Sequence, residues 1–379
     1  MVLRKLNYIF LCSNFPVPRT NQFVKLVRKN DIKSYVFYIN RMQDTVRGTT
    51  NSNYFEFQHK FQPLSIQRVI AIFKFFRYIN KTLIKEAVEN YFIFHVDSLD
   101  LYFISLLFKL KYKDSKIVFE VRDLHTVQVS GIFRHFFICL ERFLMLYLDI
   151  LIITSPKYYT YYYRKIYKGH VYLIENIPDL DEYMILSPKN NEILTIGYVG
   201  VIRYPIQLLN LVSVIKKLNT DGLKIKLKVW GGIAPFLHDE IMTEFKSSNM
   251  IEYLGAFNYT QSIYNIFNSF DILYSVYNTD FINVSLAIPN KYYEALFFRK
   301  PIIVASNTYL SEIVKREGIG IAVDSTSIEE LYIAIKELFD VDLNWFVKSK
   351  INLTKRNRNE LIELFINEFS EYIKTVNKL

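Results

Sequence analysis

The stretch NVSLAIPNKYYEALFFRKPIIVAS, residues 283–306, predicts one helix followed closely by one buried strand. Pro289 has the fixed φ that suits the first turn of a helix, so the helix is expected to begin there. The run PIIVAS, residues 301–306, is short and rich in β-branched residues, which is typical of a strand in a parallel sheet. A helix that leads into such a strand is one repeat of an α/β fold.

The start of this helix carries two charged side chains that suit an anionic ligand. It places Asn290 and Lys291 at the positive end of the helix dipole, and Glu294 follows three residues after Lys291 on the same face. Lys291 can meet a diphosphate, and the carboxylate of Glu294 can accept hydrogen bonds from both hydroxyls of a ribose. By themselves, the two residues also fit an ordinary surface ion pair.

Strands and helices alternate in the same way over both halves of the chain, which predicts two doubly wound domains around parallel sheets. In the second half we expect strands at LTIGYVG, KIKLKVWGG, MIEYLGAF, DILYSVY, PIIVAS and GIAV. In the first half we expect strands at LNYIFLCS, SYVFYIN, YFIFHVD, KIVFEVRD, DILIITS and VYLIEN.

The length of 379 residues also favours two domains over one. Residues 179–191 are polar and have prolines nearby, which makes them the best linker candidate. We therefore predict a first domain at 1–187, a second domain at 188–352 and a charged helical tail at 353–379 that packs back toward the first domain.

The composition favours a folded protein of a reducing compartment. Hydrophobic residues make up 51% of the chain and charged residues 22%, which argues against disorder. The two cysteines, Cys12 and Cys139, have neither the spacing of a metal site nor that of a disulfide framework. The apolar run at the N-terminus lacks a cleavage site, and no apolar stretch reaches about 18 residues. We expect a cytoplasmic protein with no transmembrane helix.

The chain is basic, with 47 Lys and Arg against 37 Asp and Glu and a formal net charge of +10. This charge favours nucleic acid, a phosphorylated ligand or an anionic membrane as the partner, and it does not choose among them. A basic surface that is merely solvated fits equally.

The loop after the first strand of the second half is a candidate anion site, because ligands of open α/β sheets bind beyond the carboxyl ends of strands. Gly197 and Gly200 lie where this strand should end, and Arg203 lies where a helix should begin. A glycine lets the backbone approach a phosphate, and an arginine can clamp it with two hydrogen bonds. An ordinary turn with a surface arginine would look the same.

The second half, from about residue 194 to 339, resembles the C-terminal domain of GT-B glycosyltransferases. It is most similar to bacterial enzymes of the family four or group 1-like type, which build capsular and surface polysaccharides. The resemblance rests on the order and spacing of GYVGVIRY, VWGG, IEYLGAF, DILYSVY, NVSLAIPNKYYEALFFRKPIIVA, SEIV and GIGIAV. It implies an α/β fold of GT-B architecture, with two Rossmann-like doubly wound domains that face a cleft.

The resemblance also implies a set of donor-binding residues. Lys291 and Arg203 would bind the diphosphate of a nucleotide-diphosphate-sugar donor, and Glu294 would bind its ribose. Gly231 and Gly232 match a glycine turn near the nucleotide. No metal and no cofactor is expected. The full donor-side set is Gly200, Arg203, Gly231, Gly232, Asn290, Lys291 and Glu294.

The first half resembles the acceptor domain of these enzymes more weakly, through NFPVPRTNQ, FHVDSLD, FEVRDLH, DILIITSP and LIEN. The resemblance implies that these strand-end loops face the cleft. Each polar side chain there has a purely structural hydrogen bond as its alternative role. The candidates are Arg19, His95, Asp97, Arg122, Asp123 and His125.

Two positions depart from the family pattern. Many retaining members carry two glutamates with seven residues between them, and the first of these positions is Leu286 here. The arginine that usually follows the phosphate-loop glycine is also missing, because Val201 follows Gly200. The donor sugar and the stereochemical outcome therefore stay open. Asp123 is the candidate acceptor base if the enzyme inverts, and His125 is the second catalytic candidate.

We predict a glycosyltransferase that moves a sugar to a hydroxyl of a glycan or a lipid-linked glycan in surface polysaccharide synthesis. A sugar-nucleotide epimerase or hydrolase on the same fold is the alternative among enzymes. A basic nucleic-acid-binding protein would explain the charge, but no recognised nucleic-acid motif is present. An NAD-dependent dehydrogenase would need G-x-G-x-x-G after the first strand, which is absent.

Residues 66–85 form a further signal, because a helix there would be apolar on one face and basic on the other. This pattern suits a core helix with a solvated face, and it also suits contact with the inner face of the cytoplasmic membrane through anionic lipid. The expected apolar face consists of Ile72, Phe76, Ile79 and Leu83. The expected basic face consists of Lys74, Arg77, Lys81 and Lys85, flanked by Phe73, Phe75 and Tyr78.

Overall fold

The computed structural model describes residues 5–40, 53–59, 66–84, 90–112, 114–178, 180, 193–234, 237–340 and 361–367. Its contacts divide the chain into two compact units. Unit 1 comprises Met1–Glu175 and Asn357–Leu379, and unit 2 comprises Asn176–Arg356. The domain limits predicted at 187/188 and 352/353 both lie outside the described residues, as does almost all of the predicted linker.

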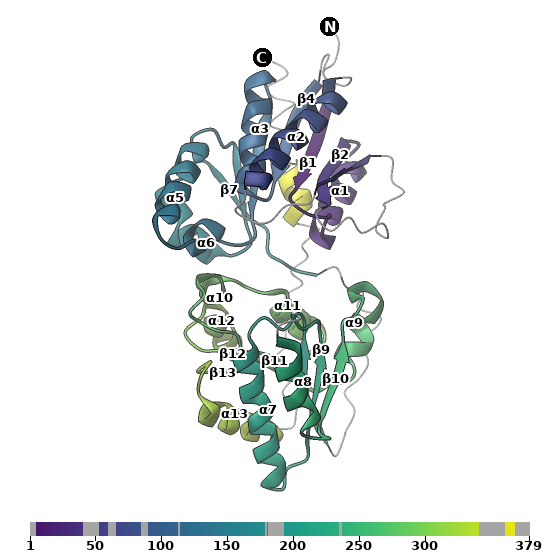
Figure 1. The fold of residues 1–379 in the computed structure, drawn as a ribbon, viewed down its shortest axis with the longest axis vertical. Helices are drawn as coiled ribbons and strands as arrows, with labels where there is room; N and C mark the ends of the chain where they lie inside the picture. Colours follow the sequence, from purple (N-terminus) through teal and green to yellow (C-terminus); the bar gives the residue numbers. More distant parts are fainter. Residues whose placement is uncertain are drawn as a thin grey trace. The chain divides into compact units, whose positions relative to one another are not determined.

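Unit 1 contains a parallel sheet of seven strands in the order β3-β2-β1-β4-β5-β6-β7 (Figure 1). The strands are β1 (Lys5–Cys12), β2 (Lys33–Asn40), β3 (Tyr54–Gln58), β4 (Asn90–Val96), β5 (Lys116–Val121), β6 (Ile150–Ile153) and β7 (His170–Leu173). All the expected strands are present, and β3 is an additional one. The sequence did not reveal β3 because it is a short edge strand whose residues are only partly buried.

Helices cover both faces of this sheet, as the α/β prediction requires. They are α1 (Pro18–Lys29), α2 (Ile66–Leu83), α3 (Leu99–Lys111), α4 (His125–Gln128), α5 (Ile132–Met145) and α6 (Pro156–Tyr161). On one face, Phe23 of α1 packs in a core with strand residues such as Tyr8 and Val118. On the other face, Phe108 of α3 stacks on Phe94, which alternates with the residues of the first core along β4.

Residues 361–367 are helical and belong to the first core of unit 1. Ile362, Phe365 and Ile366 are buried there. The ring of Phe365 lies 6.4 Å from that of Phe23 and 5.0 Å from that of Tyr172, measured between centroids. Residues 361–367 thus complete a core whose other described members lie between Leu6 and Ile174.

Unit 2 contains a parallel sheet of six strands in the order β10-β9-β8-β11-β12-β13. The strands are β8 (Leu194–Val199), β9 (Ile225–Trp230), β10 (Ile251–Gly255), β11 (Ile272–Ser275), β12 (Ile302–Ala305) and β13 (Gly320–Val323). The helices are α7 (Pro205–Thr220), α8 (His238–Lys246), α9 (Tyr259–Phe267), α10 (Ile282–Leu286), α11 (Asn290–Phe297), α12 (Tyr309–Glu317) and α13 (Ile328–Asp340). The strand order reverses between β8 and β11, and this is the switch point beyond which a doubly wound sheet binds ligands.

Helix α2 confirms most of the pattern expected for residues 66–85. Ile72, Ile79 and Leu83 are buried, and Phe76 is half-buried. Phe75 was expected beside the basic face, and that prediction was wrong: the ring is fully buried. It lies three residues after Ile72 and four before Ile79, so the helical period turns it toward the core.

Candidate functional site

The carboxyl ends of β8 and β9 approach each other so closely that only glycine fits between them. Gly200 follows β8 with a φ of 130°, and Gly231 follows β9 with a φ of 150°. A Cβ atom added to Gly231 would lie 1.8 Å from the carbonyl oxygen of Gly200. The backbone N–H of Gly200 donates to the carbonyl oxygen of Trp230 at 2.8 Å, and that of Gly231 donates to Gly255 at 2.8 Å. These contacts hold three strand ends together at one edge of the sheet.

The side chain of Lys291 lies over this backbone. A Cβ atom added to Gly200 would lie 3.6 Å from Cε and 3.9 Å from Nζ of Lys291. Lys291 is the second residue of α11, because the helix begins at Asn290 with Pro289 as its N-cap. A cation, a helix N-terminus and a bare glycine backbone therefore meet at one place, which suits an anion.

Glu294 anchors the same cluster from within the core of unit 2. Its side chain is buried, and its Oε2 atom lies 3.0 Å from Nζ of Lys291. The hydroxyl of Tyr259, the first residue of α9, donates to Oε1 at 2.8 Å. Tyr259 was not among the predicted residues, and its place at the start of a helix is a weak sequence signal.

The other donor-side candidates are more open. Arg203 and Asn290 are exposed, and within the described part of the chain Arg203 makes no hydrogen bond or ion pair. Gly232 is half-buried, and its carbonyl oxygen accepts from the N–H of Ile202 at 3.0 Å. A Cβ atom added there would meet no other heavy atom within 4 Å.

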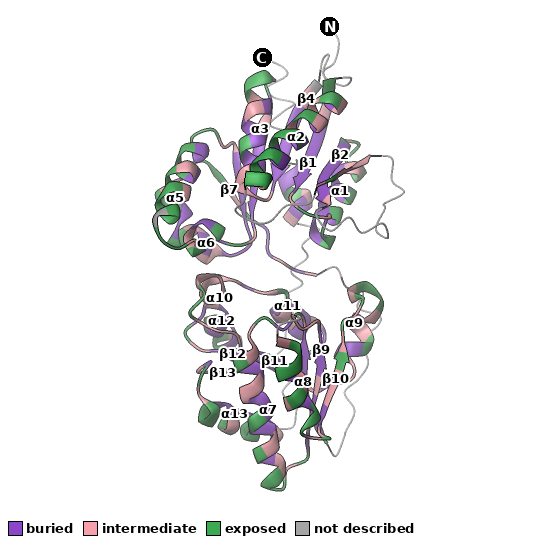
Figure 2. Ribbon diagram, in the orientation of Figure 1, coloured by how far each residue is buried: buried purple, intermediate pink, exposed green. Residues whose placement is uncertain are grey.

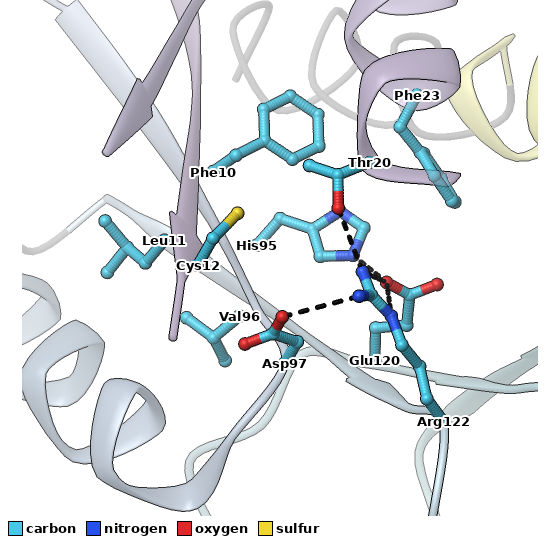
Figure 3. A pocket seen from close by; sticks show the side chains of 10 residues that line it. All are labelled: Phe10, Leu11, Cys12, Thr20, Phe23, His95, Val96, Asp97, Glu120 and Arg122. Carbon is cyan, nitrogen blue, oxygen red and sulfur yellow. Dashed lines mark hydrogen bonds and ion pairs between the residues drawn. The ribbon is translucent and has the colours of Figure 1, made fainter. Parts of the chain in front are cut away.

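A second polar cluster lies in unit 1, where β1, β4 and β5 end beside α1 (Figure 3). Its centre is Glu120, which is buried and was not predicted. Arg122 donates to Oε2 of Glu120 from Nη2 at 2.6 Å and from Nε at 3.1 Å, and Nε of Arg19 donates to Oε1. A small pocket opens at this cluster. It is lined by Phe10, Leu11, Cys12, Thr20, Phe23, His95, Val96, Asp97, Glu120 and Arg122.

The two arginines hold the carboxylate of Glu120 in its charged form. Burial alone would raise the pKa of Glu120, but the positive charges of Arg122 and Arg19 outweigh it and keep the pKa well below its usual value. Nε2 of His95 lies 3.5 Å from Oε2 of Glu120, and the Tyr8 hydroxyl lies 3.0 Å from Nδ1 of the same ring. His95 is thus positioned from both sides.

Arg19 also donates two hydrogen bonds to the backbone. Nη1 donates to the carbonyl oxygen of Glu175 at 2.8 Å, and Nη2 donates to that of Ile174 at 2.7 Å. Arg19 therefore ties the start of α1 to the segment that leaves β7. These are the structural hydrogen bonds that the sequence allowed as the alternative role for this residue.

Arg122 and Asp97 are the partly exposed members of the cluster. Nη1 of Arg122 lies 3.5 Å from Oδ2 of Asp97, and Nη2 donates to the hydroxyl of Thr20 at 3.1 Å. Burial raises the pKa of Asp97, and the charge of Arg122 partly opposes this effect. A polar ligand at the pocket would meet these two side chains first.

Asp123 and His125 are exposed and are not among the residues that line this pocket. The backbone N–H of His125, the first residue of α4, donates to the carbonyl oxygen of Asp123 at 3.1 Å. In the described ranges, no group of three or more His, Cys, Asp or Glu side chains is placed to hold a metal ion. None of the described helices is both long and apolar enough to cross a membrane.

Solved structures with the same arrangement of elements cover nearly the whole chain. Sucrose-phosphate synthase from Thermosynechococcus elongatus is 13% identical with a TM-score of 0.70, and the match covers 99% of this chain and 100% of that chain. Anabaena HepE in complex with UDP and glucose is 13% identical with a TM-score of 0.68, covering 98% and 100%. The chain has the GT-B fold.

Other comparisons agree with this fold or find nothing. A glycosyltransferase from Rickettsia africae is 14% identical with a TM-score of 0.64, covering 97% of this chain and 99% of that chain. No family model and no curated protein sequence matches the chain. At these identities the likeness establishes the GT-B fold and leaves the activity to be argued from the residues.

Within this GT-B fold, the structure brings the predicted residues together in two groups. Gly200, Gly231, Lys291 and Glu294 meet at the edge of the unit 2 sheet. Arg19, His95, Asp97 and Arg122 meet around Glu120 in unit 1. The polar residues of these groups that sequence reasoning missed include Tyr259, Glu120, Tyr8 and Thr20.

Proposed function

We propose that the chain is a glycosyltransferase whose unit 2 binds a nucleotide-diphosphate-sugar donor. The observation that carries this proposal is the position of Lys291, which lies over the Gly200 backbone and within 3.0 Å of the Glu294 carboxylate. A diphosphate at Gly200 would meet the Lys291 ammonium and the free N–H groups of α11. The ribose next to it would face Glu294.

The same groups account for catalysis by charge stabilisation. When the bond from sugar to diphosphate breaks, negative charge develops on the leaving oxygen. We propose that Lys291, Arg203 and the N-terminal N–H groups of α11 stabilise that charge, because preorganised charges and dipoles lower such a barrier most effectively. This scheme requires neither a metal ion nor a cofactor, and we propose that the enzyme uses none.

The two carboxylate oxygens of Glu294 have different partners. Oε1 is held by the Tyr259 hydroxyl, and Oε2 is paired with Lys291. Because Lys291 would turn toward the incoming diphosphate, Oε2 becomes available to a ribose hydroxyl. Donor binding would thus replace the Lys291–Glu294 ion pair with two contacts, one from Lys291 to the diphosphate and one from a ribose hydroxyl to Glu294. The buried carboxylate would therefore keep a partner.

On the acceptor side, we propose that a hydroxyl of a glycan or a lipid-linked glycan is bound in unit 1. Arg122 and Asp97 are partly exposed at the pocket around Glu120 and can bind sugar hydroxyls. Asp123 remains our candidate base for an inverting reaction, with His125 as the second candidate. Their exposure is compatible with contact to an acceptor.

We further propose that this activity serves surface polysaccharide synthesis, such as that of a capsule, at the inner face of a bacterial cytoplasmic membrane. The support is the basic face of α2, where Lys74, Arg77 and Lys81 are all exposed. Lys85, the fourth basic residue of the predicted face, lies outside the described residues. Each basic residue near an anionic surface contributes about 1 kcal/mol to binding, so several together suffice for reversible attachment.

The test is a panel of nucleotide sugars, first by thermal shift and then by product analysis with and without glycan acceptors. A glycosyltransferase releases nucleoside diphosphate and extends the acceptor, so an elongated glycan is the expected product. Release of free sugar that is independent of any acceptor would indicate a hydrolase. A changed sugar on an intact nucleotide would indicate an epimerase, and a protein that binds nucleic acid but no nucleotide sugar would contradict the proposal altogether.

A further inference from the structure

Helix α5 exposes a row of large apolar side chains on the side that faces away from its own core. Phe136 is 61% exposed, Phe143 is 51% exposed and Leu146, which directly follows the helix, is 76% exposed. Cys139 is exposed between them. The spacing i, i+3, i+7 and i+10 places the four residues on one side of the helix, which we term the α5 apolar face.

The opposite side of α5 is apolar as well. Leu144 and Met145 are buried, and the side chain of Glu141 is buried between the hydroxyls of Tyr162 and Tyr163, which donate to it at 2.8 and 2.7 Å. A helix that needed to be apolar only toward its core would carry polar residues where α5 carries Phe136 and Phe143. An exposed apolar row of this kind is typical of a surface that contacts a partner.

The exposed charges on α5 and on two further helices of unit 1 have one sign. Helix α5 packs beside α3, and α3 packs beside α2. On these three helices, among the described positions, every exposed charged residue is basic. They are Lys74, Arg77, Lys81, Lys111, Arg134 and Arg142. These helices carry two acidic residues among their described positions. Asp100 forms an ion pair with Arg68, and Glu141 is buried.

From this combination we propose that the α5 apolar face inserts into the interfacial region of an anionic lipid bilayer. Large apolar side chains with basic neighbours are what a helix lying in a membrane surface presents. A second copy of the chain fits less well, because a symmetric contact would bring like charges together. Figure 2 shows that the outer side of α5 is largely exposed. The inference deepens the membrane attachment proposed above, and it names α5 where the sequence pointed to α2.

The test uses Cys139 as a reporter, because it lies on the α5 apolar face and the only other cysteine, Cys12, is buried. The native protein is labelled at Cys139 with an environment-sensitive fluorophore and mixed with vesicles of phosphatidylglycerol and phosphatidylcholine. We expect a blue shift of the emission, because the label enters the bilayer interface. The control carries its label at Ile333→Cys in a Cys139→Ser background, because Ile333 is an exposed residue of α13 in unit 2. The emission of this control should not shift.

The matching variant is Phe136→Ser/Phe143→Ser/Leu146→Ser, measured by vesicle co-sedimentation. Removing three inserted apolar side chains should weaken vesicle binding at least about tenfold. The control Ile328→Ser/Ile333→Ser/Leu364→Ser removes the same number of exposed apolar side chains elsewhere and should bind like the parent. Calorimetry with a nucleoside diphosphate should give the same affinity for all three proteins, which separates this inference from the donor site.

Other outcomes would contradict attachment through α5 or identify a different partner for it. Vesicle binding that is lost in Lys74→Gln/Arg77→Gln/Lys81→Gln but kept in the α5 variant would overturn the inference and leave attachment to α2. No binding by the parent would overturn both. A parent that is dimeric in solution and becomes monomeric in the α5 variant would show that a second copy covers this face. High salt should reduce binding without abolishing it, because the apolar contribution is not screened.

Discussion

The ammonium of Lys291 lies 3.0 Å from the carboxylate of Glu294, and the two side chains are 14% and 1% exposed. A pair this well shielded is not the solvated i, i+3 pair that the sequence alone would allow. The pair fixes Lys291 above Gly200, where a Cβ atom would lie 3.6 Å from its Cε. The pair therefore holds the ammonium beside the proposed diphosphate position until a donor replaces it with the contacts proposed above.

The glycines at the strand ends provide a test of the local geometry. Gly231→Ala should lower the free energy of unfolding by roughly 1–3 kcal/mol, because φ is 150° and the new Cβ would lie 1.8 Å from the backbone oxygen of Gly200. Gly232→Ala is the matched control, since no heavy atom lies within 4 Å of its Cβ position. Urea unfolding of both variants is the measurement, and equal stabilities would mean that the strand ends are not this close.

Arg203 is expected to contribute to binding rather than to folding. It is exposed, so Arg203→Ala should leave the melting temperature unchanged. Loss of a charge-assisted hydrogen bond to the diphosphate should weaken nucleoside diphosphate binding by roughly 1.5–3 kcal/mol. Arg316→Ala, at an exposed position of α12, is the control and should bind as the parent does. An Arg203→Ala protein with parental affinity would place this side chain outside the donor site.

Glu294→Gln should reduce nucleotide affinity and also lower the melting temperature, because it removes the charged partner of Lys291 in a well-shielded pair. Glutamine keeps the size of the side chain and an acceptor for Tyr259, but it is a weaker acceptor for ribose hydroxyls. Tyr259→Phe removes the donor that holds Oε1 at 2.8 Å and should have a smaller effect, about 0.5–1.5 kcal/mol. Calorimetry and thermal unfolding of both variants separate the two roles. A large loss of stability with intact binding would make Glu294 a purely structural residue.

Glu120 should make unit 1 sensitive to acid. Its pKa in the folded protein lies well below the ordinary 4.5, so the unfolded chain binds the proton more readily. The stabilisation is complete above the ordinary pKa and is lost as the pH falls through the lowered one. Glu120→Gln leaves Arg19 and Arg122 without their buried carboxylate and should cost roughly 3–5 kcal/mol at neutral pH.

The measurement is urea unfolding of the parent and Glu120→Gln from about pH 7 down to about pH 3, a window that spans the ordinary pKa. The difference between the two proteins should shrink as the pH falls. Glu240→Gln, which changes an exposed carboxylate of α8, should follow the parent throughout. A difference that stays constant with pH would mean that Glu120 is not ionised in the fold.

Local patterns in the sequence were enough to predict the order of strands and helices in both units. The buried strands are continuous apolar runs, and such runs are visible without any knowledge of partners. The proximity of Lys291 and Glu294 was also predictable from a local pattern, because residues three apart in a helix lie about one turn apart on the same face. The edge strand β3 was missed because half-buried residues leave no such run.

Residues whose role depends on distant partners were not predictable in this way. Glu120 lies within a strand, and one of its partners, Arg19, is 101 positions away in the chain. Tyr259 contacts Glu294 across 35 positions. The exposed side of α5 was also missed, because an apolar helix gives no sign of which apolar residues face outward until the packing is known.

The most direct test of the proposed donor site is calorimetric titration of nucleoside diphosphates into the parent, Lys291→Ala and Lys315→Ala. Lys315 is an exposed residue of α12 and controls for the loss of one positive charge. The account predicts that the parent and Lys315→Ala bind at least one nucleoside diphosphate equally well, and that Lys291→Ala binds it more weakly by roughly 1.5–3 kcal/mol. Equal affinity of all three proteins, or no binding by the parent, would contradict it.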